Sequence, residues 1–376
     1  MPDQTLDESL LTVGSASPFL PGTNIQFAWD STCLGLIKTC PRLYQYTMID
    51  GYVSRGESIH LRFGIEYHQT LQDYDIARAT GISHEDAVHD AISDLVRRTH
   101  DWSVDETVKP GKYKNRQTLV SLVLDYLDHY VDDPAETYIK SDGKPAVELS
   151  FRFELDWGPT SYHRCTSMKS ADGGSGGEQV PCDGRLSPYT GERIGGCDEP
   201  CSFVMDTNSG ELVHQPYLLC GHMDRVVTFN DQLFVMDHKT TVTTPSQYYF
   251  DQYEPHNQMT LYTIAGQVVL NAPVKGVIVR AAQILLEKEH RFVSGFTLRT
   301  ADQLDEWMND LRLHLERAED YATRGYWPMN DTSCNNYGGC KFRGICSKSP
   351  SVREIYLKSD FEQLPHEERW NPLRSR

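Results

Sequence analysis

The feature that most constrains the fold is a pair of apolar runs joined by a short polar turn, CGHMDRVVTFNDQLFVMDHKTT. Strand-like apolar content on both sides of Asn230 and Asp231 predicts a β-hairpin. Each predicted strand also carries a carboxylate, Asp224 on the first and Asp237 on the second, and Lys239 follows two residues after Asp237. The hairpin therefore holds charged groups in a segment otherwise suited to a hydrophobic core.

These charged groups allow two interpretations. Asp237 and Lys239 lie two apart on a predicted strand, so their side chains leave the same face and could form a simple salt bridge. Asp224 on the adjacent strand favours a metal site, because two converging carboxylates repel one another unless a cation lies between them. Oxygen clusters of this kind bind hard divalent ions such as Mg²⁺. A lysine beside the metal could orient or deprotonate a water, or stabilise charge on a phosphoryl oxygen.

The size and composition of the chain limit its class. Its 376 residues, 39% of them hydrophobic and 24% charged, suffice for a large hydrophobic core. No apolar run approaches the roughly 18 to 20 residues of a membrane-spanning helix, and the acidic first residues lack the pattern of a secretory signal. We therefore expect a cytoplasmic protein with no membrane partner. The net charge of −17 argues against nonspecific coating of nucleic acid but allows a local basic groove.

The predicted elements divide the chain into four parts. Residues 1–23 are expected to form a flexible tail and residues 24–140 a helical subdomain. An α/β core is expected over 141–330, with a Gly-, Ser- and Cys-rich insertion at about 158–214, and a cysteine-rich segment and tail occupy 331–376. Helices are predicted over residues 30–48, 56–80, 115–133, 256–270 and 302–324, with a further helix capped by Ser83 and Asp86, and strands over 147–157, 275–288 and 290–300.

Three motifs follow one another in the predicted core, GHMDRV, then VMDHKTT, then QMTLY. Their order resembles the core of the PD-(D/E)xK nuclease superfamily. The chain is similar, more closely, to the RecB-like branch, which includes CRISPR-associated single-strand exonucleases, AddB-type nuclease domains and phage-encoded exonucleases. The resemblance implies an α/β fold in which helices flank a mixed central sheet, with an N-terminal helical subdomain and a C-terminal iron–sulfur segment.

The resemblance also implies roles for the matching residues. In that branch a histidine on an upstream helix joins the motifs, and FGIEYHQTLQDY supplies His68. The implied ligands of Mg²⁺ or Mn²⁺ are His68, Asp224 and Asp237, with Lys239 assisting the attacking water. Without the three motifs, His68 would be interpreted as a histidine on the surface of a helix.

Three further residues extend the implied site. Gln258 and Tyr262, one helical turn apart, are implied to position the DNA strand, although without the core motif both could be packing residues. Glu148, in PAVELSF, resembles a glutamate that precedes the core in several members and is a further metal candidate. A charged residue on the solvent face of a strand is the commoner explanation for Glu148.

Ten cysteines in an intracellular chain favour metal or iron–sulfur ligation over a disulfide framework. CNNYGGCKFRGIC places Cys334, Cys340 and Cys346 at equal spacing, one ligand short of a closed four-cysteine site. In the RecB-like branch, one cysteine in a C-P-R-x-Y motif before the core and three after it hold a 4Fe–4S cluster, and CPRLYQY makes Cys40 the implied fourth ligand. Several relatives have a shorter gap at the position of Cys334. Zinc is the competing occupant, because four thiolates suit either metal.

The remaining cysteines lie apart from these four. Within the insertion, Cys165, Cys182, Cys197 and Cys201 could bind Zn²⁺, or could be free thiols in a loop. Cys33, on the predicted helical face of Cys40, is expected to be a buried small hydrophobe.

The resemblance implies a metal-dependent deoxyribonuclease, with single-stranded DNA ends attacked 5′ to 3′ as the preferred reaction. Recombination, repair, and phage or CRISPR-related DNA processing are the implied settings, in a bacterial or phage-infected cell, with recombination or CRISPR-adaptation proteins as possible partners. The alternatives are an endonuclease, a nuclease active only within a complex, an inactive cluster-bearing DNA-binding or scaffold protein, and a zinc-bound interaction module built on the insertion. Candidates for the DNA path, each also explicable as a surface charge, are Lys38, Arg42, Lys114, Arg116, Arg280 and Lys341.

Overall fold

A computed structural model describes residues 17–20, 22–56, 58–159 and 216–374. It also describes the backbone of four short strands paired two by two, β5 (Met168–Ser170) with β6 (Gln179–Pro181) and β7 (Arg185–Leu186) with β8 (Arg193–Ile194). The chain forms two compact units, each assembled from separate stretches of sequence. Unit 1 comprises Met1–Ser54, Arg152–Gly221 and Met308–Arg376, and unit 2 comprises Arg55–Phe151 and His222–Trp307. The expected four-part division of the chain stays a prediction.

The sheet of unit 2 is built on the predicted hairpin. β9 (Leu218–Phe229) and β10 (Gln232–Thr241) pair antiparallel around Asn230 and Asp231. Both turn residues have positive φ, 49° and 58°, as a two-residue turn matched to the twist of the strands requires. The hairpin expected from the apolar runs is therefore confirmed, and its turn fixes which residues of the two strands face each other.

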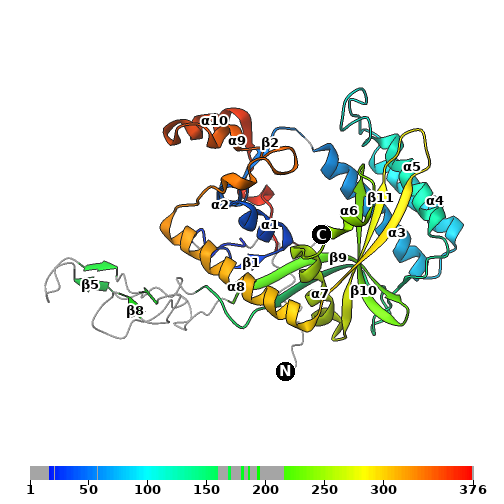
Figure 1. Cartoon of the computed structure of the whole chain (residues 1–376), viewed down its shortest axis with the longest axis horizontal. Coiled ribbons are helices and arrows are strands. Elements are labelled where there is room, and N and C mark those ends of the chain that lie inside the picture. Colours follow the sequence, from blue (N-terminus) through cyan, green and yellow to red (C-terminus); the bar gives the residue numbers. More distant parts are fainter. Residues whose placement is uncertain are drawn as a thin grey trace. The chain divides into compact units, whose positions relative to one another are not determined.

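The hairpin continues into a mixed sheet. β10 pairs parallel with β11 (Val274–Gln283), which pairs antiparallel with the edge strand β12 (Arg291–Leu298). β3 (Glu136–Thr137) and β4 (Val147–Glu154) pair with β9. The described residues thus have the mixed central sheet and flanking helices that the resemblance implied (Figure 1).

Helices pack on both faces of the β10–β11 pair. Side chains alternate between the two faces of a strand, and neighbouring residues of β10 and β11 are buried, so both faces are covered. α7 (Asn257–Leu270) covers one face, where a Cβ atom on Gly266 would lie 3.1 Å from Val274 and 3.2 Å from Val235. α6 (Gln247–Asp251) precedes α7 in the crossover from β10 to β11. On the other face lie α3 (Ile59–Ala79), α4 (His84–Arg98) and α5 (Arg116–His129). Their shared hydrophobic core includes Ala282, in β11, and Ile284, just after it.

The cap predicted for α4 is confirmed, and α5 also begins at a polar cap. Ser83 caps α4, accepting a hydrogen bond from the backbone N–H of Asp86 at 3.1 Å and donating to its carboxylate at 2.8 Å. Asn115 caps α5 by accepting from the N–H of Thr118 at 2.8 Å. Polar caps of this kind satisfy the N–H groups that the first turn of a helix leaves free.

Unit 1 combines the N-terminal segment with the C-terminal one. β1 (Ala28–Trp29) pairs parallel with the first residues of β9, and β2 (Tyr52–Ser54) pairs with β13 (Phe361–Gln363). Aromatic packing closes a small core in which Tyr46, Phe342 and Phe361 meet. Its other elements are α1 (Ser31–Thr39), α2 (Pro41–Tyr44), a π-helical turn (Gln45–Ile49), α9 (Arg343–Cys346), α10 (Arg353–Asp360) and 3₁₀ turns at Asp331–Ser333, Asn336–Gly338, Pro350–Val352 and His366–Glu368. The long helix α8 (Ala301–Arg324) follows β12 and crosses the boundary between the units.

The single helix expected over residues 30–48 is wrong. It is interrupted at Cys40, whose backbone is extended with φ −165° and ψ 117°. Cys40 precedes Pro41, and the proline ring disfavours helical geometry at the residue before it. Cys33 and Cys40 therefore do not share a helical face, and Cys33 is fully buried as expected of a small hydrophobe.

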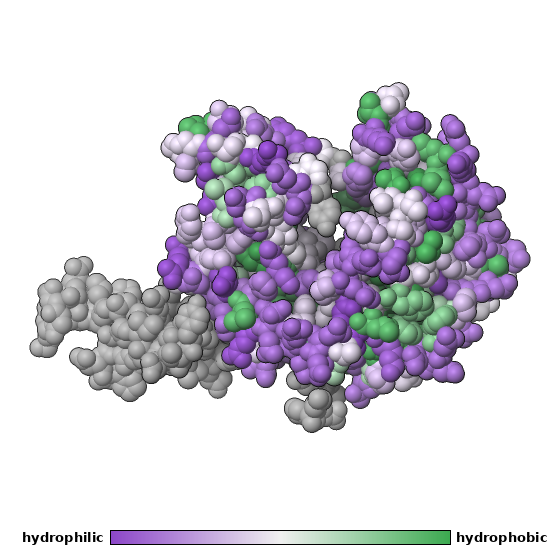
Figure 2. All heavy atoms as spheres, in the orientation of Figure 1, coloured by the Kyte–Doolittle hydropathy of each residue, from purple (hydrophilic) through white to green (hydrophobic). Residues whose placement is uncertain are grey.

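The visible surface is largely hydrophilic, with hydrophobic residues in separate small patches (Figure 2). Within the described ranges, none of the helices combines the length and the apolar content needed to traverse a bilayer.

Candidate active site

The hairpin and α3 bring the first two metal candidates together. Asp224 lies on β9 and His68 on α3, and His68 Nδ1 is 3.1 Å from Asp224 Oδ2. The same carboxylate oxygen accepts a hydrogen bond from the backbone N–H of His238 at 2.9 Å. The strand β10 thus holds Asp224 in place through its main chain, a contact with no signature in the sequence.

A second chain of contacts runs from β10 to α7. Lys239 Nζ donates to Asp237 Oδ1 at 3.0 Å and to Gln258 Oε1 at 3.2 Å. Gln258 Nε2 in turn donates to the Tyr262 hydroxyl at 3.0 Å. The structure therefore joins these four residues, from the strand and helix that the motifs assigned to them.

Charge and burial set the protonation of this cluster. Burial opposes the charge on His68, but the Asp224 carboxylate outweighs it and raises the pKa of His68. Burial would raise the pKa of Asp224, yet His68, then His238 and Lys239, hold it far below its ordinary range. Burial raises the pKa of Asp237, although Lys239 counters it. Burial opposes the charge on Lys239, but the carboxylates of Asp237 and Asp224 outweigh it and raise the pKa of Lys239. The two carboxylates thus each depend on a cationic neighbour.

The fit of this cluster to a divalent cation rests on its donor set. As the side chains stand, no three His, Cys, Asp or Glu groups within the described residues converge closely enough to hold a metal ion. The carboxylate of Asp237 is buried, and both of its oxygens lie close to Lys239 Nζ, Oδ1 at 3.0 Å and Oδ2 at 2.8 Å. Two carboxylates and an imidazole are donors that Mg²⁺ or Mn²⁺ accepts, so the residues fit such an ion.

A comparison with known families decides the classification. The sequence matches the family described as the PD-(D/E)XK nuclease superfamily over residues 32–347. The chain belongs to this superfamily. The match suggests metal-dependent hydrolysis of phosphodiester bonds in DNA, and Mg²⁺ or Mn²⁺ is the metal that PD-(D/E)XK nucleases typically use. A search of curated proteins finds no match to this chain.

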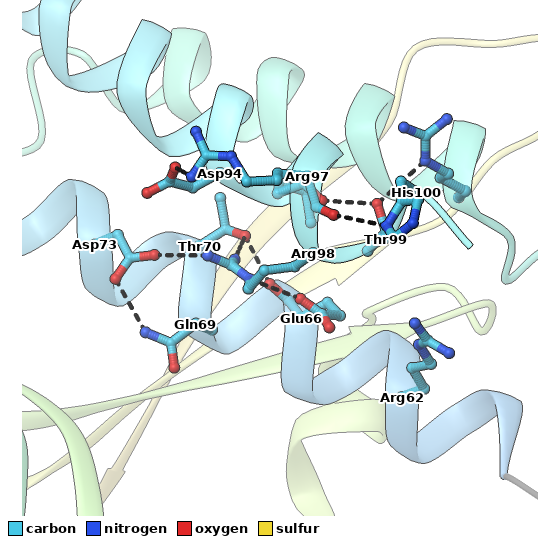
Figure 3. A network of polar contacts seen from close by, with 12 residues as sticks. Arg62, Glu66, Gln69, Thr70, Asp73, Asp94, Arg97, Arg98, Thr99 and His100 are labelled. Carbon is cyan, nitrogen blue, oxygen red and sulfur yellow. Dashed lines mark hydrogen bonds and ion pairs between the residues drawn. The ribbon is translucent and has the colours of Figure 1, made fainter. Parts of the chain in front are cut away.

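In this PD-(D/E)XK nuclease, a clamp from α4 steadies the helix that carries His68. Arg98 donates to Glu66 at 2.9 Å, to Asp73 at 3.1 Å and to Thr70 at 2.9 Å, all on α3 (Figure 3). These three partners lie on one side of α3 and bracket His68 in the sequence. The clamp therefore fixes the position of α3 beside β9.

Beneath the site lies a network of buried charges that the sequence did not indicate. Arg225 Nη1 is 3.1 Å from Asp75, and Arg280 donates to Asp133 at 2.7 Å. His238 faces this network, with Nδ1 3.5 Å from the Tyr126 hydroxyl, and burial holds its pKa well below the ordinary value. The network joins β9 and β11 to α3 and to Asp133, and burial favours the neutral form of His238.

One further residue, Tyr249, lies close to the expected site, and Glu148 lies on β4. Tyr249, on α6, interacts electrostatically with Asp237 and Lys239, and burial raises its pKa. No pattern in the sequence singled it out, since α6 is a short helix without periodicity. Glu148 is the second residue of β4, has a backbone in the left-handed region with φ 48°, and is half-buried. Its role as a metal ligand stays a prediction.

The four cysteines expected to flank the core, Cys40, Cys334, Cys340 and Cys346, all belong to unit 1. The backbone N–H of Asn330 donates to Cys40 Sγ at 3.3 Å, and Cys334 Sγ lies 3.8 Å from the Asn330 carbonyl oxygen. The N–H of Cys340 donates to the carbonyl of Cys334 at 2.9 Å. Burial raises the pKa of Cys346, and the Cys340 and Cys40 thiols also raise it, so the three interact. Four thiols that all are free fit the donor set of an iron–sulfur cluster or of zinc.

The second expected cysteine group, Cys165, Cys182, Cys197 and Cys201, lies outside the described residues. Cys220 is buried on β9, as a core residue would be.

The basic residues considered for the DNA path separate into different environments. Arg280 is 4% exposed, donates to the carboxylate of Asp133 and stacks on the ring of Tyr130. Arg116 donates to the Thr99 hydroxyl. These two arginines hold the fold of unit 2. The three in unit 1 also have partners, since Arg42 donates to the Trp327 carbonyl, Lys341 stacks on Phe342 and Lys38 interacts with Asp310. Lys114 is different, because it is buried without an anionic partner among the described residues.

A pocket of about 680 Å³ lies elsewhere in unit 2, between α4, the segment that follows it, and α5. Apolar side chains such as Val96, Trp102 and Leu124 contribute to its lining. None of His68, Asp224, Asp237 and Lys239 lines this pocket, so it is separate from the candidate active site.

Proposed function

We propose that this chain is a metal-dependent deoxyribonuclease of the RecB-like branch that digests single-stranded DNA from an end, preferably the 5′ end. The observation that carries the proposal is the meeting of His68 with Asp224, and of Asp237 with Lys239 and Gln258. Carboxylates and a half-buried lysine on adjacent strands, with a glutamine from the next helix, suit the hydrolysis of a phosphodiester. The single-strand and 5′ preferences rest on the motif resemblance alone.

In this proposal His68, Asp224 and Asp237 hold one Mg²⁺ or Mn²⁺ ion. The bound ion supplies Lewis acidity toward the phosphoryl oxygen and lowers the pKa of water. Lys239 has three N–H groups, of which two bond Asp237 and Gln258, and the third is available to an attacking water or a phosphoryl oxygen. Gln258 and Tyr262, bonded to each other, position the DNA strand beside Lys239.

The proposal assigns a structural 4Fe–4S cluster to Cys40, Cys334, Cys340 and Cys346. The cluster would join the C-terminal segment to the residues after α1, where Asn330 already bonds Cys40 and Ser333 bonds the Thr39 carbonyl at 2.8 Å. DNA recombination, repair or CRISPR-related processing, with proteins of those pathways as partners in the cytoplasm, is proposed from the motif resemblance.

One experiment tests the enzyme. Protein purified without oxygen is incubated with Mg²⁺ or Mn²⁺ and with DNA that is labelled at one end, single-stranded or double-stranded. We expect metal-dependent release of short products from single strands, and a loss of rate of about 10²- to 10⁴-fold in Lys239→Ala, since Lys239 acts on the reacting groups.

Two controls sharpen the result. Cleavage that persists undiminished in Lys239→Ala contradicts the mechanism, provided that DNA binding and folding are unchanged in that variant. Closed single-stranded circles are expected to resist digestion, and their cleavage would make the enzyme an endonuclease. A colourless, zinc-loaded preparation would replace the cluster with zinc at the four cysteines.

A further inference from the structure

We propose that Lys114 is a phosphate-binding residue, which holds a phosphate group of the DNA strand close to the end of β10. The inference deepens the proposed function and rests on it for the identity of the strand, whereas the phosphate site itself rests on the surroundings of Lys114.

The first observation is burial without an anion. Lys114 is 8% exposed, and among the described residues no carboxylate lies within ion-pair distance of its ammonium group. Its contacts are the Thr240 hydroxyl, 3.3 Å from Nζ, and the ring of Phe63, whose centre is 5.3 Å from Nζ. A lysine has three N–H donors, so this cation is left with capacity for an anionic acceptor.

The second observation is that the burial is imposed by a rigid segment. Lys114 immediately precedes Asn115, the cap of α5, whose side chain bonds Gly111 O at 3.1 Å as well as the N–H of Thr118. A Cβ atom on Gly111 would lie 2.1 Å from the carbonyl oxygen of Asp105, so only glycine allows the segment to pack this closely. Lys114 is therefore held at its position before any ligand arrives, which lowers the entropic cost of binding.

The third observation concerns location. Thr240, the partner of Lys114, is the residue after Lys239 on β10, and the two side chains leave opposite faces of the strand. His60 is exposed at the start of α3, and partial burial, together with the charge of Lys114 as the smaller cause, lowers the pKa of His60. Lys114 therefore lies on a different face of the strand from the proposed metal ligand Asp237, where it would bind another phosphate than the one cleaved.

A phosphodiester or terminal phosphate fits this site because both carry a full negative charge and oxygen acceptors. Neither Thr240 nor Phe63 can neutralise the lysine. The burial of an unpaired cation lowers the stability of the folded protein, and proteins retain such costs at binding sites. The proposal therefore makes opposite predictions for stability and for DNA binding.

The test replaces Lys114 by methionine, which keeps the apolar stem and removes the charge. A short single-stranded oligonucleotide labelled at its 3′ end is titrated without divalent metal, so that it is bound and not cleaved. We expect Lys114→Met to weaken binding several-fold and to reduce the slope of log affinity against log salt by about 0.7, the loss of one phosphate contact on a single strand. Its midpoint of urea unfolding is expected to equal or exceed that of the wild type.

The matched control is Lys112→Met, which removes the same charge from an exposed lysine of the same segment. It is expected to leave both the affinity and the salt slope nearly unchanged. Lys114→Arg should retain most of the affinity, since it restores the charge. An oligonucleotide with a 5′-phosphate is compared with one that ends in a 5′-hydroxyl: a loss confined to the first assigns a terminal phosphate to Lys114, and an equal loss in both assigns an internal phosphodiester.

Unchanged affinity in Lys114→Met, or a wild type that binds no oligonucleotide, overturns the inference. A variant that is less stable but binds DNA normally does so too, because it would make Lys114 a structural residue. If the wild type binds through Lys114 but cleaves no DNA with Mg²⁺ or Mn²⁺, the proposed nuclease function fails while the phosphate site stands.

Discussion

At the scale of single residues, the site consists of charges that neutralise one another in pairs. Asp224 is paired with His68 and Asp237 with Lys239, and the side chain of Asp237 is buried while that of Asp224 is 17% exposed. A divalent ion that binds here must displace the His68 proton, because a protonated imidazole cannot be a ligand. The affinity of the site for metal is therefore expected to depend on pH through His68.

The pH dependence can be stated with its sign. The pKa of His68 is raised above its ordinary value of 6.5 in the metal-free protein. The His68–Asp224 pair thus stabilises the metal-free fold fully below pH 6.5, and the contribution is lost as pH rises through the raised pKa. Over the same interval, Mn²⁺ binding is expected to tighten by up to about tenfold per pH unit, as one proton is displaced.

Calorimetric titration of Mn²⁺ at several pH values measures this dependence, with urea unfolding of the metal-free protein alongside. In His68→Gln the free energy of unfolding should no longer fall as pH rises through this interval. Mn²⁺ should bind this variant more weakly, and its affinity should no longer increase with pH over the same interval. His89→Gln is the control, since His89 is 78% exposed on α4 and far less coupled to the fold. A wild type whose Mn²⁺ affinity is flat across the interval would contradict the assignment of His68.

At the scale of elements, the position of α3 depends on the clamp from α4. Arg98 is 29% exposed in its side chain and bonds three residues of α3, whereas its neighbour Arg97 is 75% exposed and pairs with Asp94 of its own helix. The difference follows from the helical period, which turns adjacent residues to different sides. Of these two arginines, Arg98 is therefore the one that contacts the helix carrying His68.

We expect Arg98→Met to lower the free energy of unfolding by about 1.5 to 3 kcal/mol, the range for hydrogen bonds to charged groups. Arg97→Met should cost less than about 0.5 kcal/mol, as exposed pairs do. Urea unfolding of the two variants measures the difference, and equal midpoints would show that the clamp adds nothing. Reduced Mn²⁺ affinity in Arg98→Met alone would indicate that the clamp also positions His68.

At the scale of the whole molecule, each compact unit is assembled from distant parts of the sequence. Unit 1 contains the proposed cluster cysteines, and unit 2 contains the proposed metal ligands and Lys114. The loss of the cluster is therefore expected to loosen unit 1 while unit 2 keeps its fold.

Cys340→Ala is expected to abolish the visible absorption of the cluster and to raise amide hydrogen exchange over residues 331–363, with β10 and β11 still protected. Cys33→Ala serves as the control, because Cys33 is fully buried in the same unit but contacts Met48 rather than the other thiols. It should keep the colour. Uniform loss of protection in both units would contradict the separate behaviour of unit 1.

The sequence alone determined the elements whose signals are local. The hairpin follows from its apolar runs and the Asn-Asp turn, α4 begins at its predicted cap, and Asp237 and Lys239 share a face because strand side chains alternate. The motif order also placed the chain in the correct superfamily. Local signals failed at Cys40, where Pro41 interrupts a helical pattern that otherwise continues.

Only the tertiary structure decided which distant groups meet. In the folded chain His68 contacts Asp224, and Arg280 bonds Asp133 and stacks on the ring of Tyr130. Lys114 is buried against Thr240 and Phe63. In the sequence, Lys114 and Arg280 are equivalent basic residues. The physical reason is that burial and charge pairing arise from packing between segments far apart in the chain, whereas turns, caps and strand periodicity depend on neighbouring residues alone.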